Sequence, residues 1–363
     1  MKITAYRTWI ANLPIEQPFT RIGENPHSRR AFIVLELTTD EGIVGIGLTS
    51  FGAKLTKTLK CAVDEFAELI VGRDPLHIGA IRRAVYDAAA PAGPEGIFTL
   101  ALAAIDIALW DIKGKACNQP LWQLLGGHRQ KVPTYASGAL MRGMSADLVA
   151  RACERMLEYG FREIKMHLAM SDDGHMSSDV ERARLVRNAI GPDIKLMADI
   201  NQRWRTDQAI QIGSRLEEFN FAWLEDVTAC QDYAGLSQIA ASLTTPIASG
   251  ELLWGLTPFR QLIEARATDL VMVDLFRAGG ITTWMKIAAL AEAFHLSVVS
   301  HLVPEIHVHL IGAIPNGLTV EYMPWSFRLY EDTPMPVGGS LSMPDLPGLG
   351  LTLDYPALAH YAL

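Results

Sequence analysis

The feature that most constrains the fold is a regular alternation of short apolar runs and amphipathic segments over residues 132–325. Eight runs have the length and composition of strands, and helical periodicity fills most of the gaps between them. The runs read VPTYAS, EIKMHL, IKLMADI, FAWLED, PIASGE, LVMVDL, SVVSH and LTVEY. Alternating strands and helices favour a parallel sheet, and eight units predict a closed (β/α)8-type barrel of the α/β class, with a short last helix.

A different pattern precedes this region. Residues 2–10 and 31–38 alternate as strands do, and a D-E-G turn leads from the second run into IVGIGL, which predicts an antiparallel meander. Helical periodicity follows over residues 55–125, and residues 100–116 are apolar on nearly every side, as expected for a buried helix. The N-terminal region therefore reads as a separate α+β domain.

The chain has 363 residues, which is room for a barrel and one smaller domain. We predict an α+β capping domain at 1–125, a catalytic barrel at 126–325, and a Pro- and Gly-rich tail at 326–363 that packs back on the capping domain. The formal charge is −8 and there is no basic cluster, so nucleic acid and anionic membranes are poor candidates as partners.

The expected cellular location is inferred from sequence features that this chain lacks. The four cysteines form no C-x-x-C pair, which indicates buried thiols in a reducing compartment. The N-terminus has no signal-peptide core, and no stretch approaches the roughly 18 apolar residues that span a bilayer. We expect a cytoplasmic protein that forms a homo-oligomer.

Three acidic residues, Asp199, Glu225 and Glu251, follow three successive strand candidates at equal spacing. Barrel active sites form where strands end, and neighbouring strands lie about 4.8 Å apart, so these carboxylates should converge. Converging anions need a cation, and an oxygen-only ligand set favours Mg²⁺. For any one acid alone, capping of the next helix is the simpler explanation.

Lys165 and His167 lie two residues apart on the second strand candidate and should both point into the barrel. A lysine charge there would keep His167 neutral and able to accept a proton. Pairing of Lys165 with an acid on strand 3 or 4 is the structural alternative. Both residues are therefore candidate bases.

On the opposite side of the barrel, His301 ends the seventh strand candidate and Asp274 ends the sixth. A carboxylate beside a histidine fixes its tautomer and supports its protonated form, which is typical of an acid/base pair. Proton-transfer groups would thus lie on both sides of the metal. Removing a proton next to a substrate carboxylate needs this arrangement, because a divalent cation must stabilise the enediolate.

Other classes of protein fit less well. A metal-dependent hydrolase would carry His-x-His at the end of its first strand, but His307 and His309 follow the helix-start signal Pro304-Glu305. On a helix these two histidines do not share a face. A racemase that uses His167 and His301 as paired bases stays open, as does a family member that only binds its ligand.

Several motifs resemble those of one family. The stretch AAIDIALWDIKGKACNQPLWQLLGG (103–127) and the motifs MADINQRW, WLED, SGELLWG, DLFRAGG, SHLVPEIHVHL and VEYMPW are similar to motifs of the enolase superfamily. The similarity covers essentially the whole chain and is greatest to the mandelate racemase/muconate lactonizing enzyme group, in particular the mandelate racemase subgroup. It implies a modified (β/α)7β barrel under an α+β capping domain.

The resemblance also implies roles for individual residues. Asp199, Glu225 and Glu251 would bind Mg²⁺, the His301–Asp274 pair would transfer protons, and Glu321 would donate a proton-bearing oxygen to the enediolate. Arg277 would take the place of a lysine in mandelate racemase. The substrate-binding residues that we predict on this basis are Ser137, Asn201, Arg277, Trp254, Arg21 and His27.

One motif departs from the family pattern, because Lys165-Met166-His167 replaces Lys-x-Lys.

The region before residue 31 is a candidate lid. It forms a basic loop that would cover the site and that contains Arg21, Asn25, His27, Arg29 and Arg30. Ser50-Phe51-Gly52 is a second lid candidate. A polar lid suits a hydroxylated acid. We predict Mg²⁺-dependent dehydration of a hydroxylated carboxylic (sugar) acid to a 2-keto acid, with racemisation or epimerisation, and then cycloisomerisation, as alternatives.

Overall fold

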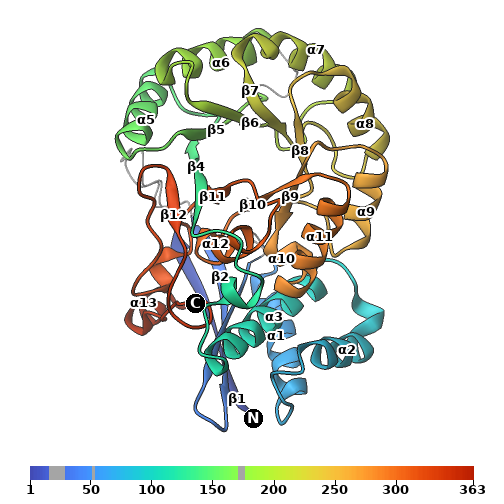
Figure 1. The fold of residues 1–363 in the computed structure, drawn as a ribbon, viewed down its shortest axis with the longest axis vertical. Coiled ribbons are helices and arrows are strands. Elements are labelled where there is room, and N and C mark those ends of the chain that lie inside the picture. The colour runs from blue at the N-terminus through green and yellow to red at the C-terminus, as the bar shows by residue number, and fades with distance from the viewer. Residues whose placement is uncertain (16–28, 51–53, 171–175) are drawn as a thin grey trace.

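The computed structural model describes residues 1–15, 29–50, 54–170 and 176–363. Its N-terminal part begins with three antiparallel strands in the order β1-β2-β3. Their bounds are β1 (Ile3–Pro14), β2 (Arg29–Thr39) and β3 (Val44–Thr49). The predicted meander is confirmed, and Figure 1 shows these strands below the barrel.

Helices complete this N-terminal part: α1 (Thr56–Ile70), α2 (Ile78–Ala89), α3 (Ile97–Ala116) and α4 (Leu121–Leu124). Of the 20 residues of α3, 15 are buried, as its all-round apolar sequence predicts. The helix packs so closely on β3 that a Cβ at Gly47 would lie 2.1 Å from the carbonyl oxygen of Ala104. Only glycine fits there.

Eight parallel strands form the barrel, and all eight predicted runs are confirmed as strands. They are β4 (Lys131–Leu140), β5 (Glu163–His167), β6 (Lys195–Asp199), β7 (Phe221–Glu225), β8 (Ile247–Ser249), β9 (Leu270–Asp274), β10 (Ser297–His301) and β11 (Val320–Tyr322). Between β10 and the segment before β11, backbone hydrogen bonds from Val298 to Asn316 and from Leu318 to Val298 nearly close the ring.

Helices follow the first seven strands. They are α5 (Ala146–Glu158), α6 (Met176–Ile190), α7 (Thr206–Leu216), α8 (Tyr233–Ser242), α9 (Thr257–Glu264), α10 (Leu275–Ala278) with α11 (Ile281–Ala293), and α12 (Pro304–Ala313). After β11 the chain instead enters a single 3-10 turn, Phe327–Leu329. The barrel is therefore of the modified (β/α)7β kind.

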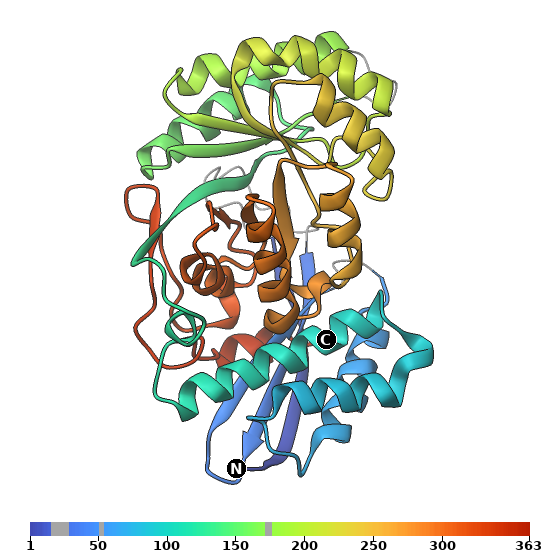
Figure 2. The same cartoon turned by 45° about the vertical axis from the view of Figure 1, so that its right-hand side comes forward.

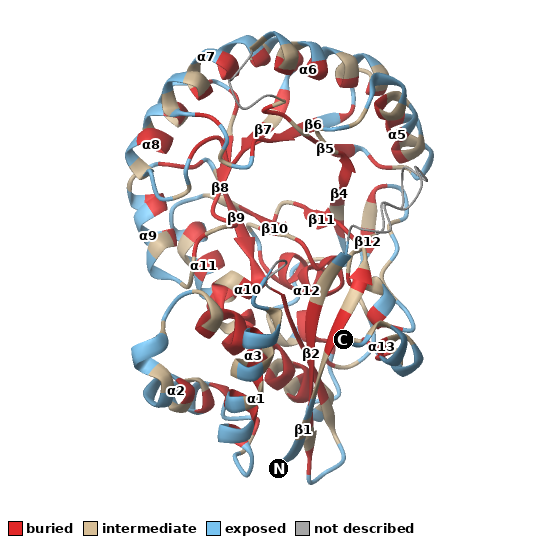
Figure 3. Cartoon of the chain, turned by 180° about the vertical axis from the view of Figure 1, so that it is seen from behind, coloured by how far each residue is buried: buried red, intermediate tan, exposed pale blue. Residues whose placement is uncertain are grey.

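The interior of the barrel is a packed layer rather than a channel. It contains Tyr135, Met197, Trp223, Ala248, Met272 and Val299, which come from six different strands. Figure 3 shows the strands as almost entirely buried, whereas the helices expose their outer faces. Polar side chains nearer the carboxyl ends of the strands thus lie next to this apolar layer.

Helix α3 of the capping part lies against α10 and α11 of the barrel, and Figure 2 shows the capping helices beneath the barrel. Buried Asp106 of α3 accepts hydrogen bonds from Arg82 (2.7 Å) and from the backbone N–H of Thr282 (2.8 Å). Arg82 also donates to the carbonyl oxygen of Gly279. These bonds fix the capping part over the carboxyl end of β9.

The tail, with β12 (Ser340–Ser342) and α13 (Tyr355–Tyr361), contacts both other parts. β12 pairs with β4, and α13 lies beside β1. Buried Asp111 of α3 accepts hydrogen bonds from the backbone N–H groups of Ile46 and Leu349, each 2.8 Å long. We propose the divisions at residues 125 and 325 on the basis of these separate contact sets.

Two expectations need correction. Cys61 and Cys117 are exposed, so the expectation of buried thiols is wrong for them, although all four cysteines are free. The first barrel strand does not end near Ser137 but continues to Leu140, with Gly138 in the left-handed region at φ 77°. Across the described residues, no helix is both long enough and apolar enough to cross a membrane.

Candidate active site

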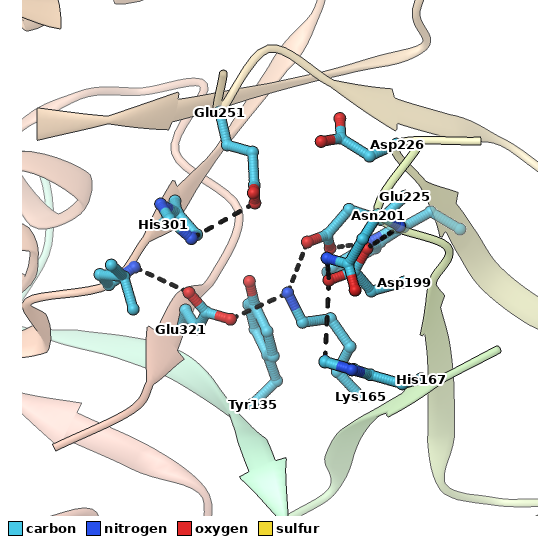
Figure 4. Close-up of polar contacts among 12 residues, drawn as sticks. Tyr135, Lys165, His167, Asp199, Asn201, Glu225, Asp226, Glu251, His301 and Glu321 are labelled. Atoms are coloured by element: carbon cyan, nitrogen blue, oxygen red, sulfur yellow. Dashed lines mark hydrogen bonds and ion pairs between the residues drawn. The ribbon is translucent and has the colours of Figure 1, made fainter. Parts of the chain in front are cut away.

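Acidic side chains gather where β6, β7 and β8 end (Figure 4). Asp199 and Glu225 are the last residues of adjacent strands and are paired in register. Glu251 follows two residues after β8. All three side chains are buried, so water does little to screen the negative charges that meet here.

Asp199 is held by its own loop. The backbone N–H of Asn201 donates to Asp199 Oδ1 (2.7 Å), and the Asn201 side-chain amide donates to Oδ2 (2.6 Å). Asn201 adopts a positive φ of 49°, which turns the chain back toward the aspartate. The predicted substrate-binding Asn201 therefore lies against a predicted metal ligand.

Glu225 is engaged on both oxygens. Lys165 Nζ lies 2.5 Å from Oε1, and Trp223 Nε1 donates to Oε2 at 3.1 Å. Burial raises the pKa of Glu225 to about 8; Lys165 opposes this shift and the charge of Asp199 adds to it. The carboxylate thus lacks enough positive charge around it, despite the lysine.

The carboxylate of Glu251 has fewer polar contacts than that of Glu225. Its Oε2 is buried and has no hydrogen-bond partner among the described residues, although His301 Nε2 lies 3.4 Å away. Burial, and then the charges of Asp226 and Glu225, raise the pKa of Glu251 well above its ordinary value. Asp226, which follows Glu225 directly, adds a fourth buried carboxylate whose Oδ2 is also unpartnered within the described chain.

These acids do not form a ready-made metal cage. Within the described ranges, no three Asp, Glu, His or Cys side chains are grouped closely enough to hold an ion as they stand. The reason is visible in Figure 4, where Glu225 is turned to Lys165 and Glu251 to His301. The donor set nevertheless fits a hard divalent cation, because it offers carboxylate oxygens alone and includes an orphaned buried oxygen on Glu251.

Lys165 is buried on β5 and has a second ion pair, with Glu321 Oε1 at 2.8 Å. Burial lowers the pKa of Lys165, but the charges of Glu225 and Glu321 raise it well above its ordinary value overall. The lysine is therefore charged. Glu321 Oε2 accepts a further hydrogen bond from the backbone N–H of Leu302 (2.7 Å).

His301 and Asp274 form a close pair at the ends of β10 and β9. His301 Nδ1 lies 2.7 Å from Asp274 Oδ2, and the backbone N–H of Arg277 donates to Asp274 Oδ1. Burial raises the pKa of Asp274, but the hydrogen bond with His301 and the charge of Arg277 lower it far below its ordinary value overall. The ionised aspartate keeps a proton on His301 Nδ1 and leaves Nε2 for chemistry.

His167 ends β5 on the other side, and its Nε2 is 3.8 Å from Asp199 Oδ2. Burial lowers the pKa of His167 to about 4; Asp199 opposes this shift, and Arg142 and Lys165 add to it. A neutral His167 beside a charged lysine stays a prediction, and this lowered pKa is consistent with it.

Of the other predicted substrate-binding residues, some lie at the site and some lie outside the described residues. The guanidinium of Arg277 stacks over the ring of Trp254 at 5.7 Å and donates to the carbonyl oxygen of Glu251. Ser137 is buried, and its Oγ has no partner in the part of the chain that the structure describes. Arg21 and His27 lie outside the described residues, together with Asn25, Phe51 and Gly52.

Arg30, a member of the predicted basic loop, is described. It lies at the barrel mouth, where its guanidinium stacks over the ring of Trp325 at 5.0 Å and its Nε donates to Ser50 Oγ at 3.4 Å. Burial lowers the pKa of Arg30, and the charge of Asp274 opposes that shift. Arg30 is thus a capping-domain cation that interacts electrostatically with Asp274 of the His301–Asp274 pair.

The sequence did not reveal Arg142 and Asp226. Arg142 was hidden because the first strand appeared to end near Ser137, which placed residue 142 in the following helix–loop region. Asp226 directly follows Glu225 in the WLED motif, so the sequence could have indicated that a fourth carboxylate lies at the site. His307 and His309, in contrast, are in α12 as predicted and bind separate groups, the carbonyl oxygens of Leu302 and Leu349.

A capping domain over the carboxyl ends of a parallel barrel, with acids on three successive strands and a His–Asp pair opposite, defines an enolase-type barrel enzyme. Residues 5–126 match the mandelate racemase/muconate lactonizing enzyme N-terminal domain, and residues 147–357 match the enolase C-terminal domain-like family. The chain belongs to the mandelate racemase/muconate lactonizing enzyme group of the enolase superfamily.

Three known proteins illustrate the similarity. L-talarate/galactarate dehydratase of Salmonella typhimurium is 33% identical over 331 residues, 91% of this chain and 82% of that protein. 3,6-anhydro-alpha-L-galactonate cycloisomerase of Streptomyces coelicolor is 33% identical over 369 residues, 99% of each chain. The crystal structure of L-talarate dehydratase from Polaromonas sp. JS666, complexed with Mg and L-glucarate, has a TM-score of 0.91 at 32% identity, covering 100% of this chain and 97% of that one.

Proposed function

We propose that the protein uses Mg²⁺ to remove the proton next to the carboxylate of a hydroxylated sugar acid, and that the net reaction is dehydration to a 2-keto acid. The observation that carries this proposal is the placement of an acid cluster between two histidines, His301 and His167, on opposite sides of the barrel mouth. Similarity to the talarate and galactarate dehydratases supports the sugar-acid substrate class.

The metal would be held by Asp199, Glu225 and Glu251, whose oxygens suit a hard ion. When bound, Mg²⁺ would anchor the substrate carboxylate and stabilise the charge of the enediolate. The raised pKa values of Glu225 and Glu251 are consistent with this assignment, because burial and then neighbouring negative charges disfavour ionised carboxylates that have no cation beside them. The Mg-complexed relative supports the choice of ion.

Lys165 contributes a fixed positive charge rather than a base. Its two ion pairs keep it protonated, so the strand-2 candidates for proton transfer are reduced to His167. The lysine also holds Glu321, whose other oxygen bonds to Leu302 next to His301. We infer that this chain of contacts fixes Glu321 beside the reacting carbons.

In the proposed reaction the C2–H bond breaks and a histidine takes the proton, while the electron pair forms the enediolate. Protonated His301 then gives a proton from Nε2 to the C3 hydroxyl, which leaves as water. The resulting enol tautomerises to the 2-keto acid. Asp274 supports the imidazolium through its 2.7 Å contact with Nδ1.

Substrate hydroxyls would be bound by residues around this centre. Ser137 offers an unpartnered buried hydroxyl within the described chain, and Asn201 offers an amide beside Asp199. Arg277 and Trp254 shape the wall next to Asp274. Arg21 and His27 stay proposals from the sequence alone, and Arg30 is a described cation suited to a second substrate carboxylate.

The decisive experiment is a screen of aldonic and aldaric acids with purified protein, with and without Mg²⁺. A semicarbazide-reactive keto product that forms only with Mg²⁺ supports the proposal. Proton NMR in D₂O then follows exchange at C2. Absence of a keto product from every sugar acid, with Mg²⁺ present, would overturn dehydration.

A second candidate is cycloisomerisation, which the cycloisomerase relative favours because the two chains align over 99% of their lengths. It would give a product of unchanged mass instead of one lighter by water, so mass spectrometry separates the two. Racemisation or epimerisation would show as exchange with inversion at C2 and no keto acid. In that case His167→Gln should block exchange from one enantiomer only.

The remaining sequence expectations stay part of this proposal. The partner is a small-molecule carboxylic acid rather than nucleic acid or a membrane. A cytoplasmic location is supported by four free cysteines, and size-exclusion chromatography with light scattering would test the expected homo-oligomer.

A further inference from the structure

Arg142, in the loop after β4, connects the ends of three strands. Its Nη1 donates to Asn201 Oδ1 at 2.7 Å, and its Nη2 donates to the carbonyl oxygen of Asp199 at 3.2 Å. Its Nε donates to the carbonyl oxygen of Leu168. The guanidinium is therefore fixed by partners on both sides of the gap between β5 and β6.

This position brings Arg142 to one specific atom of His167. Arg142 Nη1 lies 3.5 Å from His167 Nδ1, while the other ring nitrogen, Nε2, faces Asp199 Oδ2 at 3.8 Å. A guanidinium carries N–H donors only and stays protonated. A proton on Nδ1 would point at those donors, so Nδ1 must present its lone pair, and the neutral ring has its proton on Nε2.

His301 has the opposite arrangement. Its Nδ1 faces the carboxylate of Asp274 at 2.7 Å, which can only accept, so the proton of neutral His301 is on Nδ1 and the lone pair is on Nε2. The same side chain on two sides of the site thus has opposite tautomers, because one has a cation behind it and the other an anion.

We propose that Arg142 is a positioning residue that makes His167 a hydrogen-bond donor toward the site and prevents it from accepting the C2 proton, leaving His301 as the single acid/base group. The catalytic part of this inference rests on the proposed function. His301 Nε2 would take the C2 proton, and the same imidazolium would return it to the C3 hydroxyl, so that both groups leave from the face of the substrate toward β10. No additional proton donor or acceptor is needed for the balance.

The tautomer can be measured without any substrate, by nitrogen-15 NMR of protein labelled at histidine. The chain supplies both reference states. His307 Nδ1 donates to a carbonyl oxygen at 2.7 Å, and His309 Nε2 donates to another at 3.0 Å while Nδ1 accepts from the backbone N–H of Trp122. Signals are assigned by comparing wild type with His167→Gln, His307→Gln and His309→Gln.

We expect the His167 signal to match the Nε2–H pattern of His309 in wild type, both without and with Mg²⁺. In Arg142→Met the Nδ1–H form should gain population. A His167 signal of the Nδ1–H type in wild type overturns the proposal. A switch of tautomer on adding Mg²⁺ to wild type also overturns it, because Asp199 rather than Arg142 would then decide the proton position.

Arg182→Met is the matched control. Arg182 donates to the carbonyl oxygens of Leu140, Met141 and Met144, so it supports the same loop as Arg142 without touching His167. This variant should leave the tautomer of His167 unchanged. If it shifts His167 as much as Arg142→Met does, loop packing sets the tautomer and the proposal fails.

A second experiment tests the consequence for chemistry, with a sugar acid that the wild type turns over. His301→Asn should lower C2 exchange in D₂O at least tenfold more than His167→Gln does. Arg142→Met should allow exchange at the C2 configuration that the wild type leaves untouched, because His167 can then accept a proton. Equal losses for the two histidine variants would overturn the single-histidine assignment. If no sugar acid reacts, the proposed function fails, whereas the NMR result still decides the tautomer.

Discussion

Lys165 and Glu321 form a buried ion pair across β4, with Nζ and Oε1 2.8 Å apart, although their strands are not neighbours. Glu225 lies on the other side of the lysine at 2.5 Å, and the two carboxylates together favour its protonated form, which has no lone pair. This geometry supports the proposal that the strand-2 lysine supplies a fixed positive charge at the barrel mouth.

Replacing this lysine should damage both stability and activity. Lys165→Met leaves two buried carboxylates without their cation, and breaking a buried pair in this way costs about 3–5 kcal/mol. The free energy of unfolding from urea titration should fall by that order. Lys195→Met, which removes an exposed lysine from a pair with Glu163, is the control and should cost about 1 kcal/mol or less. Equal effects in the two variants would contradict the assignment.

Removal of one proposed metal ligand should abolish Mg²⁺-dependent activity while the fold survives. In Glu225→Gln a neutral amide replaces a carboxylate, which weakens a hard-ion site. Calorimetric titration with Mg²⁺ should show binding in wild type and a loss of at least tenfold in affinity in the variant. Glu163→Gln, at the opposite end of β5, should bind Mg²⁺ as wild type does. Full activity of Glu225→Gln, or of wild type in excess chelator, would exclude the metal site.

The His301–Asp274 pair makes a graded prediction. His301→Asn should stop turnover, and Asp274→Asn should slow it by about 10²–10⁴-fold, because an amide no longer favours a proton on Nδ1. The measurement is kcat at saturating substrate, with circular dichroism to confirm folding. Wild-type rates in both variants would show that the pair is structural.

Arg30 should affect substrate affinity more than the chemical step. Among the described residues its hydrogen bond goes to Ser50 through Nε, so its terminal nitrogens can bind a second carboxylate. We expect Arg30→Gln to raise KM for an aldaric acid about tenfold or more, with a smaller change in kcat. Arg29→Gln is the control, because Arg29 instead donates to the carbonyl oxygen of Asn12 and stacks over Tyr361. The same KM in wild type and Arg30→Gln would exclude this role.

Stability should fall in acid because of buried His309, whose pKa burial lowers from 6.5 to about 4. Between these values the unfolded chain binds the proton and the folded chain does not, so unfolding becomes easier as the pH drops. His309 alone accounts for about 2 kcal/mol between pH 7 and pH 5. Urea titrations at the two pH values should show that His309→Gln reduces this loss, whereas His128→Gln, at an exposed position, does not. An unchanged pH dependence in His309→Gln would contradict the prediction.

Much of the architecture could be predicted, because strand–helix alternation is a local property of the sequence. The eight strands, the meander, the buried α3 and the helix that carries His307 and His309 all follow from such patterns. Residues at strand ends also come together by topology alone, as Asp199 and Glu225 do.

Properties that depend on distant partners could not be predicted. The pair of Lys165 with Glu225 was the predicted alternative of a strand-4 acid. Its second partner, Glu321, lies on a strand far along the chain and reaches the lysine only after the barrel forms. Arg142 was missed because Gly138 allows β4 to continue through an irregular turn that apolar periodicity does not signal. Cys61 is exposed because it lies on the face of α1 that is not buried, and Cys117 is exposed because it follows the last residue of α3.

The contacts of Leu349 have a consequence for biosynthesis. Its N–H bonds to Asp111 of the capping domain and its carbonyl oxygen bonds to His309 of the barrel, so one late residue joins two earlier parts. Chains fold from the N-terminus as they leave the ribosome. The capping domain and barrel therefore emerge before Leu349, and a nascent chain arrested near residue 340 should hold them together through the Asp106 and Arg82 contacts without the added bonds of Leu349.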